Sequence, residues 1–209
     1  VRTLRYRLYR NLLFSLLVTA LVLVINALVI NRFQGQLDKL ATADDLTGIS
    51  NRRAFLRQAH RDVAQAGRYG TPVSLLIIDV DHFKGVNDAL GQETGDLVLK
   101  AVADEIRNTI RENDLAGRMG GEEFAVILPR TDLEAACAAA ERLRRAVAGI
   151  RMQNFGMNPD LTVSIGVAAR QDAYTDLNEL MRMGDLALDE AKKRGKNRVC
   201  TMYDRTESK

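Results

Sequence analysis

Two glycines and two glutamates stand directly before a short apolar run, and they restrict what this part of the chain can form. The run Phe124–Leu128 has the length and composition of a buried strand, and Pro129 ends it. Gly120 and Gly121 permit a positive φ and a close approach by another group. The adjacent Glu122 and Glu123 repel each other unless a cation or solvent reduces this repulsion. The pattern predicts a hairpin tip that fits either a solvated turn or a metal or phosphate site.

A second apolar run, Val73–Ile78, is followed by Asp79 and Asp81. If the two strands are neighbours in one sheet, Asp79, Glu122 and Glu123 converge at the same edge. Carboxylates without histidine or cysteine select Mg²⁺ or Mn²⁺ over zinc, and the chain has only 2 histidines and 2 cysteines. Mg²⁺ commonly takes its remaining ligands from phosphates and water. Three lysines are candidates to pair with such phosphates: Lys84, Lys192 and Lys196.

Segments with helical periodicity alternate with apolar, strand-like segments along the rest of the globular part. The helical segments lie at residues 52–66, 95–110, 133–150 and 177–194, and the further strands at 115–119 and 161–169. This alternation, with one hairpin, predicts an α/β fold in which helices flank a mixed sheet.

Composition excludes some classes of function. With 46% hydrophobic and 27% charged residues, the 209-residue chain fits one globular domain with an appendage. A net charge of +3 without tryptophan gives no broad nucleic-acid footprint, so no nucleic-acid partner is expected. Cys137 and Cys200 have no metal-ligand partner at a useful spacing, and they are expected to be buried, reduced thiols.

The segment Leu12–Ile30 differs from the rest, because it is apolar on every helical face. At the helical rise its length nearly crosses a hydrocarbon core of about 30 Å, which favours a membrane span over a buried coiled-coil stalk. The long apolar run without a small-residue cleavage site argues against a signal peptide. Residues 1–43 are therefore expected to form a long hydrophobic helix with a linker helix, and residues 44–209 the globular domain.

Basic residues flank this segment on both sides: Arg2, Arg5, Arg7 and Arg10 before it, and Arg32 and Lys39 after it. The positive-inside rule places the N-terminus in the cytosol, but a chain that begins at Val1 is also consistent with a fragment, so the topology stays open. After Asn31, the apolar residues Phe33, Leu37 and Leu40 recur at helical spacing. This stripe suits pairing with a second copy of the chain, or an ordinary amphipathic linker.

Six motifs, in this order, resemble those of the GGDEF-domain diguanylate cyclases: DDLTGISNRR, DVDHFKGVND, GQETGD, RENDLAGRMGGEEF, TVSIGVA and AKKRGKN. The resemblance covers Asp44 to about Val199. It implies a fold akin to nucleotidyl cyclase and polymerase palm domains, with a mixed five-stranded sheet and flanking helices. It also implies that a homodimer, with one GTP in each subunit, joins two GTP molecules into cyclic di-GMP and releases two pyrophosphates.

The resemblance assigns the acidic edge to metal binding and catalysis. Asp79, the Val80 carbonyl and Glu122 would bind Mg²⁺ or Mn²⁺, and Glu123 would bind a second metal or act as the base. The metal would neutralise the triphosphate and help to deprotonate the 3′-hydroxyl group. Lys84 is implied as a further catalytic residue.

The remaining motif residues are implied to bind GTP. The β- and γ-phosphates would be held by backbone N–H groups and lysine side chains, namely those of Phe83, Lys84, Lys192 and Lys196. Gly120 and Gly121 would leave room for the α-phosphate and ribose. Asn87 and Asp96 would read the guanine edge, because a carboxylate accepts from N1–H and N2–H, and adenine lacks both donors.

Two positions depart from the family pattern. The family usually has histidine where Gln92 stands and tyrosine where Asp189 stands. Gln92 can hydrogen-bond a nucleotide but cannot carry a charge. The departures are therefore expected to alter substrate affinity and to leave the chemistry intact.

Arg111 and Asp114 match the RxxD product-inhibition motif of the family, at the expected distance before the glycine pair. An arginine forks onto a phosphate or a guanine, and an aspartate accepts from guanine N–H groups. Arg142, on the following helix, is a candidate for a further contact. Alone, such a pair is more often a surface ion pair on a helix, but its position favours an inhibitory site for cyclic di-GMP.

The favoured hypothesis is an active, membrane-tethered, product-inhibited diguanylate cyclase of the bacterial inner membrane, with its catalytic domain in the cytoplasm. The alternative is a degenerate module that binds GTP or cyclic di-GMP as a sensor, or that serves as a dimerising scaffold. Intact Glu122 and Glu123 argue against degeneracy, and a scaffold would leave the acids and lysines unexplained. The sequence does not reveal the input signal, an upstream sensor or a regulatory protein.

Overall fold

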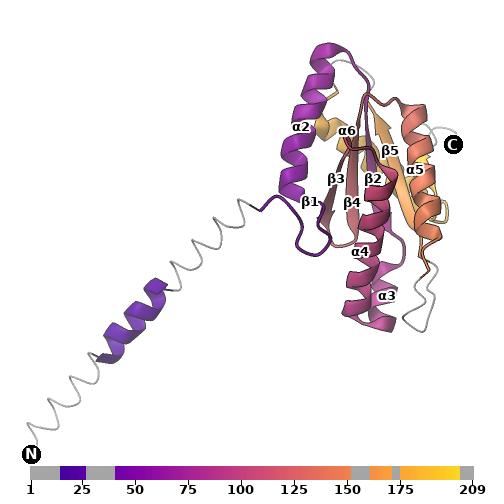
Figure 1. The fold of residues 1–209 in the computed structure, drawn as a ribbon. Coiled ribbons are helices and arrows are strands. Elements are labelled where there is room, and N and C mark those ends of the chain that lie inside the picture. Colours follow the sequence, from indigo (N-terminus) through magenta and orange to yellow (C-terminus); the bar gives the residue numbers. More distant parts are fainter. Residues whose placement is uncertain (1–14, 27–40, 152–160, 171–174, 203–209) are drawn as a thin grey trace, which may run out of the picture. The chain divides into compact units, whose positions relative to one another are not determined.

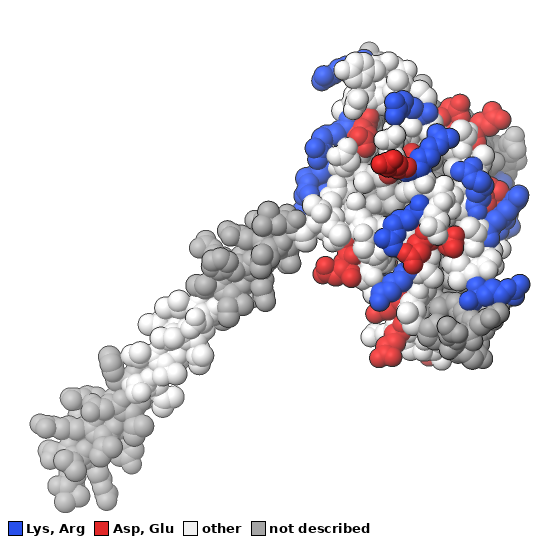
Figure 2. Space-filling view, in the orientation of Figure 1, with Lys and Arg blue, Asp and Glu red and all other residues white. Residues whose placement is uncertain are grey.

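The computed structural model describes residues 15–26, 41–151, 161–170 and 175–202, and the chain divides into a unit of residues 1–41 and a unit of residues 42–209. In the first unit, residues 15–26 are helical, and their side chains are exposed and uncharged (Figure 2). Among the described residues, no helix has both the length and the apolarity that crossing a membrane requires. The predicted span Leu12–Ile30 extends beyond the described residues at both ends and stays a prediction. The predicted stripe at Phe33, Leu37 and Leu40 lies outside the described residues.

The second unit is built on one mixed sheet in the order β1-β3-β4-β2-β5-β6 (Figure 1). β2 is antiparallel to both of its neighbours, β4 and β5, while β1 is parallel to β3 and β6 is parallel to β5. The strands are β1 (Ser50–Asn51), β2 (Val73–Val80), β3 (Leu115–Gly120), β4 (Glu123–Pro129), β5 (Val163–Ala169) and β6 (Val199–Thr201). The helices are α2 (Arg52–Tyr69), α3 (Phe83–Leu90), α4 (Gln92–Thr109), α5 (Leu133–Ala148) and α6 (Leu177–Lys193).

The mixed sheet and its flanking helices agree with the prediction, but the sheet has six strands rather than five. The two edge strands, β1 and β6, contain only 2 and 3 residues. Runs this short give no measurable alternation of apolar and polar residues, so the sequence pattern contains no sign of them. The sequence pattern did not predict α3, because its 8 residues form little more than about two helical turns, too few to establish a helical periodicity.

Local signals in the sequence start and stop the helices. The side chains of Asn51, Asp132 and Asp176 each accept a hydrogen bond from a backbone N–H in the first turn of the following helix, at 2.8–2.9 Å. Caps of this kind stabilise a helix by about 1 kcal/mol each. Gly70 ends α2 in the left-handed conformation, with φ at 65°, which a glycine adopts without a steric penalty.

Alternation along β2 divides the core into two layers. Leu76 and Ile78 pack in one layer with residues of α4 and α5, whereas Leu75 and Ile77 pack in the other with residues of α2 and α6. Successive side chains of a strand point to opposite faces of the sheet. Asp79, two residues after Ile77, therefore falls on the face that α6 covers.

Helix α6 packs on β5 at Gly166 without an intervening side chain. A methyl group at Gly166 would lie 2.1 Å from the Gly184 carbonyl oxygen and 2.4 Å from the Leu188 backbone nitrogen. A methyl group at Gly184 would in turn lie 2.7 Å from Ile77 Cγ1. This contact sets the height of α6 above β2 and β5, and with it the place of the polar side chains in the later turns of α6.

Candidate active site

The pairing of β2 with β4 brings the predicted acids to one edge of the sheet. Asp79 lies opposite Glu123 in the antiparallel register, and the Val80 N–H donates to the Glu122 carbonyl oxygen at 3.3 Å. Asp79 is buried, Glu122 is half-buried and Glu123 is exposed. The strands β2 and β4 are therefore neighbours, as the predicted convergence of Asp79, Glu122 and Glu123 required.

Burial and neighbouring charges raise the pKa values of Asp79 and Glu123. Burial raises the pKa of Asp79, and the charge of Glu122 raises it further, against the opposing effect of Lys192. Burial and the nearby Asp79 raise the pKa of Glu123, with a smaller contribution from Asp185. Crowded carboxylates of this kind are stabilised by a cation placed among them.

One cation already faces these acids, because Lys192 Nζ lies 2.9 Å from Asp79 Oδ2. Asp185, Asp189 and Lys192 recur at intervals of four and three residues, so they share one face of α6. Burial and the charge of Asp189 raise the pKa of Asp185. Asp185 was not a predicted site residue, and its spacing from Lys192 is the signal that would have found it.

In the described residues, no three histidine, cysteine, aspartate or glutamate side chains are arranged as a metal site. Asp79 is paired with Lys192 instead. The chemistry of the donors fits a hard divalent cation, because Asp79, Glu122 and Glu123 offer only oxygen atoms. A metal cation bound at Asp79 would replace the ion pair that Lys192 now forms with this carboxylate.

The N-terminus of α3 directly follows the end of β2. His82 has a left-handed conformation, with φ at 58°, and caps α3 without a side-chain hydrogen bond. The N–H groups of Phe83 and Lys84 therefore stand at the open start of the helix, where an anion is favoured. Lys196 Nζ lies 3.4 Å from His82 Nδ1. Backbone donors and a lysine from distant parts of the chain thus meet beside the acid cluster.

Asp81 holds this arrangement in place. Its carboxylate is buried and accepts hydrogen bonds from the hydroxyl groups of Thr162 and Ser164, at 2.8 and 2.7 Å. It also accepts from the Asn197 N–H at 3.0 Å. The end of β2 is thereby tied to β5 and to residues 195–197, a segment of three consecutive positive φ angles that includes Lys196. Asp81 was predicted only as the end of a strand, because nothing local in the sequence distinguishes it from a solvated acid.

Asn87 and Asp96 lie on the two helices of the α3–α4 hairpin. Gly91 separates these helices with φ at 83°, and its N–H donates to the Asn87 carbonyl oxygen at 2.9 Å. Asn87 is half-buried, whereas Asp96 and Gln92, the first residue of α4, are exposed. The structure thus places the two predicted base-reading side chains on adjacent helices.

The glycine tip of the β3–β4 hairpin is held by Arg118. Gly120 and Gly121 have φ angles of 143° and 53°, which accords with the predicted turn. Arg118 donates from Nε and Nη2 to the Gly121 carbonyl oxygen, at 3.0 and 2.8 Å, and its Nη1 lies 3.2 Å from Asp44 Oδ1. Arg118 was not a predicted site residue. It connects the turn before Glu122 to the first residues of the globular unit.

The three predicted inhibitory residues line one cavity of about 150 Å³, and they are Arg111, Asp114 and Arg142. Asp114 Oδ2 accepts a hydrogen bond from the Arg111 backbone N–H at 2.8 Å. Within the described part of the chain, the Arg111 guanidinium has no carboxylate partner. The pair therefore forms a turn rather than the surface ion pair that was the alternative.

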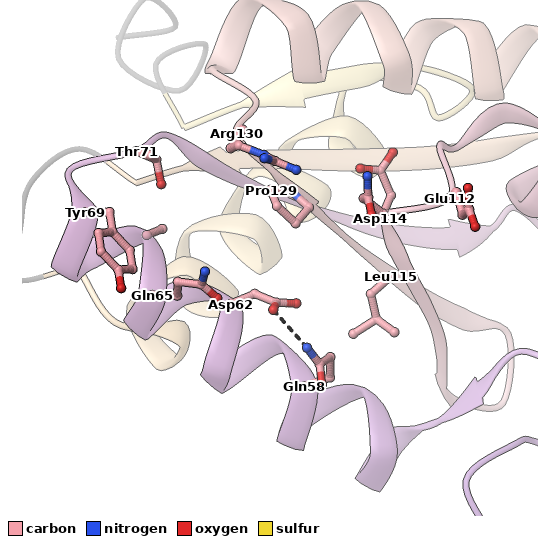
Figure 3. Close-up of a pocket in the computed structure, with 12 residues that line it drawn as sticks. Gln58, Asp62, Gln65, Tyr69, Thr71, Glu112, Asp114, Leu115, Pro129 and Arg130 are labelled. Atoms are coloured by element: carbon pink, nitrogen blue, oxygen red, sulfur yellow. Dashed lines mark hydrogen bonds between the residues drawn. The ribbon is translucent and has the colours of Figure 1, made fainter.

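Asp114 also borders a larger cavity of about 590 Å³ beside α2 (Figure 3). Gln58, Asp62 and Tyr69 of α2 line it on one side, and Arg130 lines it after the end of β4. Gln58 Nε2 donates to Asp62 Oδ1 at 2.9 Å, and burial raises the pKa of Asp62. The sequence did not predict this cavity, because it arises only where α2 packs beside β3 and β4.

Residues 41–198 match the family model described as "Diguanylate cyclase, GGDEF domain". A relative from Escherichia coli K12, the probable diguanylate cyclase DgcT, is 41% identical over 162 residues, which make up 77% of this chain and 35% of that protein. The chain thus spans about a third of the length of this curated relative.

Two solved structures resemble the globular unit. The GGDEF domain of DgcB from Caulobacter crescentus, in complex with c-di-GMP, is 36% identical with a TM-score of 0.74, and the match covers 78% of this chain and 96% of that one. The coiled coil and GGDEF domain of the same protein, also in complex with c-di-GMP, is 34% identical with a TM-score of 0.73, and the match covers 85% of this chain and 96% of that one.

The contacts of Asp81 generate a prediction about the segment that carries Lys196. In Asp81→Asn the amide keeps one acceptor oxygen, so the Asn197 N–H or a hydroxyl loses its partner, and the free energy of unfolding should fall by about 1–3 kcal/mol. Amide hydrogen exchange at Asn197 should accelerate before the protein unfolds globally. Urea unfolding and exchange measured by NMR check both effects.

The matched control is Ser74→Ala, which removes another buried hydrogen bond, from Ser74 Oγ to the Thr131 carbonyl at 2.8 Å. It should lower stability without a selective change at Asn197. Equal protection of the Asn197 amide in wild type and Asp81→Asn would contradict the anchoring role.

Proposed function

The chain belongs to the GGDEF-domain family of diguanylate cyclases, and we propose that it condenses two molecules of GTP into cyclic di-GMP with release of two pyrophosphates. One observation carries the proposal. Asp79, Glu122 and Glu123 gather at the sheet edge where the open N-terminus of α3 and Lys192 also lie. This edge offers oxygen ligands for a cation and N–H and ammonium donors for a triphosphate at the same place.

Mg²⁺ or Mn²⁺ would be held by Asp79, the Val80 carbonyl and Glu122. When bound, the ion neutralises the triphosphate and acidifies the 3′-hydroxyl group. The N–H groups of Phe83 and Lys84 bind the terminal phosphates, and Lys192 exchanges its pairing with Asp79 for a phosphate oxygen. The raised pKa of Glu123 makes it a better proton acceptor than an ordinary surface glutamate.

Each condensation step is an in-line displacement. The 3′-oxygen of one GTP attacks the α-phosphorus of the other, the bond from that phosphorus to the β-bridging oxygen breaks, and pyrophosphate leaves. Glu123 accepts the proton of the 3′-hydroxyl group. Gly120 and Gly121 carry no side chains. A methyl group built at either would meet no described atom within 4 Å, so the space beside the turn is open to nucleotide.

Two subunits must face each other, because one domain supplies one such edge and the product needs two GTP molecules. Pairing through the helix that precedes the globular unit would supply this arrangement. The solved structure of DgcB that contains a coiled coil together with its GGDEF domain supports the proposal. A membrane anchor formed by Leu12–Ile30 stays a separate proposal on the apolar character of that segment.

A degenerate, binding-only module is the second candidate, and the departures Gln92 and Asp189 are the observations in its favour. Gln92 opens α4 and is exposed, and Asp189 lies one turn from Asp185 on α6. Neither is among the three acids at the sheet edge. These positions are therefore expected to adjust nucleotide affinity, and the intact acids favour turnover.

We further propose that cyclic di-GMP inhibits the enzyme at the cavity lined by Arg111, Asp114 and Arg142. Two guanidinium groups and one carboxylate match the phosphates and guanine N–H groups of this product. These residues precede β3 or lie on α5, whereas the glycine turn is at the opposite end of β3, so they are too distant for the chemistry. Bound product would hold two domains in an arrangement that keeps the GTP sites apart.

Turnover should depend on the paired glutamates. Glu122→Gln and Glu123→Gln should each lower the rate of cyclic di-GMP formation at saturating Mg²⁺ and GTP by about 100-fold or more, because the first removes a metal ligand and the second the proton acceptor. Glu122 is in the hairpin turn and Glu123 is the exposed first residue of β4, so the unfolding midpoint should change little. Chromatography of nucleotide products, with Glu134→Gln on α5 as the charge-matched control, tests this. Full activity in either variant would defeat the site assignment.

Product inhibition should depend on Arg111. Arg111→Ala removes charged hydrogen bonds worth about 1.5–3 kcal/mol, so the inhibition constant for cyclic di-GMP should weaken by roughly 10- to 100-fold while initial rates stay similar. Progress curves at high GTP should stall early for wild type and continue for the variant. The control is Arg107→Ala, four residues earlier, in the last turn of α4 and outside the cavity. Identical stalling in wild type and Arg111→Ala would exclude this site.

A further inference from the structure

Gly95 is the fourth residue of α4, directly before Asp96; it is buried, and its N–H donates to the Gly91 carbonyl oxygen at 3.3 Å. Its φ is not among the positive glycine angles of the described residues, so the helix backbone here would accept any residue. Glycine in a helix interior is less favourable than alanine by about 1 kcal/mol. Backbone conformation therefore gives no reason for a glycine at this position, and local helix propensity opposes it.

The reason is the space that Asn87 occupies. A methyl group at Gly95 would lie 1.9 Å from Asn87 Oδ1, 3.0 Å from Asn87 Cγ and 3.2 Å from Phe83 Cζ. The Asn87 amide of α3 thus rests on the bare backbone of α4, one residue from Asp96. Any side chain at Gly95 has to push that amide away.

We propose that Gly95 is a positioning residue for base selectivity, because its missing side chain lets the Asn87 amide rest on the backbone of α4, directly before Asp96. The inference rests on the proposed function, in which these two side chains read the guanine edge. The carboxylate accepts from N1–H and N2–H of guanine, and the amide offers a donor and an acceptor for the remaining polar atoms of the base. Adenine lacks both N–H donors, so a correctly placed pair discriminates between the purines.

A methyl group at Gly95 would collide with the end of the flexible Asn87 side chain. This distinguishes Gly95 from the glycines that the fold itself requires. Asn87 is half-buried at the surface of the α3–α4 hairpin and can rotate away. A methyl group at Gly166 would instead meet backbone atoms of α6, and one at Gly117 would lie 2.6 Å from the fully buried Phe55. Substitution at Gly95 is therefore expected to displace a ligand-reading group and to leave the fold intact.

The test compares Gly95→Ala with Gly85→Ala, a matched variant in α3 where a methyl group would meet nothing within 4 Å. Calorimetry measures the affinities of non-hydrolysable GTP and ATP analogues and of inorganic tripolyphosphate, each with Mg²⁺. Gly95→Ala should weaken the GTP analogue by about tenfold, because hydrogen bonds to the base are lost, and should change tripolyphosphate binding less than about twofold. Gly85→Ala should match wild type for all three ligands.

A third variant, Asn87→Ala, shows whether Gly95 acts through the amide. In the Asn87→Ala background, Gly95→Ala should cause no further loss of GTP-analogue affinity, because two residues of one contact are not additive. This double variant also removes the collision, so it should fold even if Gly95→Ala alone does not.

Three results would overturn the proposal: an unchanged ratio of GTP- to ATP-analogue affinity in Gly95→Ala, an equal loss for tripolyphosphate, or a further loss in the Asn87→Ala background. A wild type that binds the two analogues equally would overturn the base-reading role itself. Wild-type turnover of GTP to cyclic di-GMP, measured in parallel, tests the proposed function independently.

Discussion

The antiparallel register between β2 and β4 is the constraint on which the site depends, because it sets Asp79 opposite Glu123. A slip of one residue would turn every side chain of one strand to the other face of the sheet. The apolar residues that precede these acids prevent such a slip, since Leu75 and Ile77 must face α2 and α6 while their neighbours face α4 and α5. The same packing that buries the core therefore aims the carboxylates at the end of α6.

Repulsion between the crowded carboxylates opposes folding, and residues from distant parts of the chain offset it. Lys192 pairs with Asp79, and Asp81 ties the end of β2 to β5 and to the segment that carries Lys196. Burial, with a further contribution from neighbouring carboxylates, still raises the pKa values of Asp79 and Glu123, and a cation placed among these acids would favour their charged forms. In the proposed function, a metal–nucleotide complex would supply that cation, and Lys192 would exchange its pairing with Asp79 for a phosphate oxygen.

The sequence sufficed for the parts of this account that depend on local signals. The apolar runs of β2 and β4, the glycine turn and the long helices are found where periodicity or motif spacing placed them, and the three residues predicted to bind the product line one cavity. Residues that act through distant contacts were missed. Arg118 matters because it reaches both Gly121 and Asp44, and Gly95 because Asn87 folds against it. Such contacts depend on how α6 packs on Gly166 and how α4 packs on α3, and no pattern within a single segment encodes that packing.

The coupling between metal and nucleotide binding tests most directly whether the acids at the sheet edge form a cation site for a triphosphate. Calorimetric titration of a non-hydrolysable GTP analogue, with and without Mn²⁺, would be made on wild type and Asp79→Asn. Mn²⁺ should strengthen binding to wild type more than to the variant, by about tenfold or more. The wild-type gain should shrink as the pH falls, because the raised pKa values of Asp79 and Glu123 let protons compete with the ion. An equal gain from Mn²⁺ in wild type and Asp79→Asn would exclude a cation site at these acids.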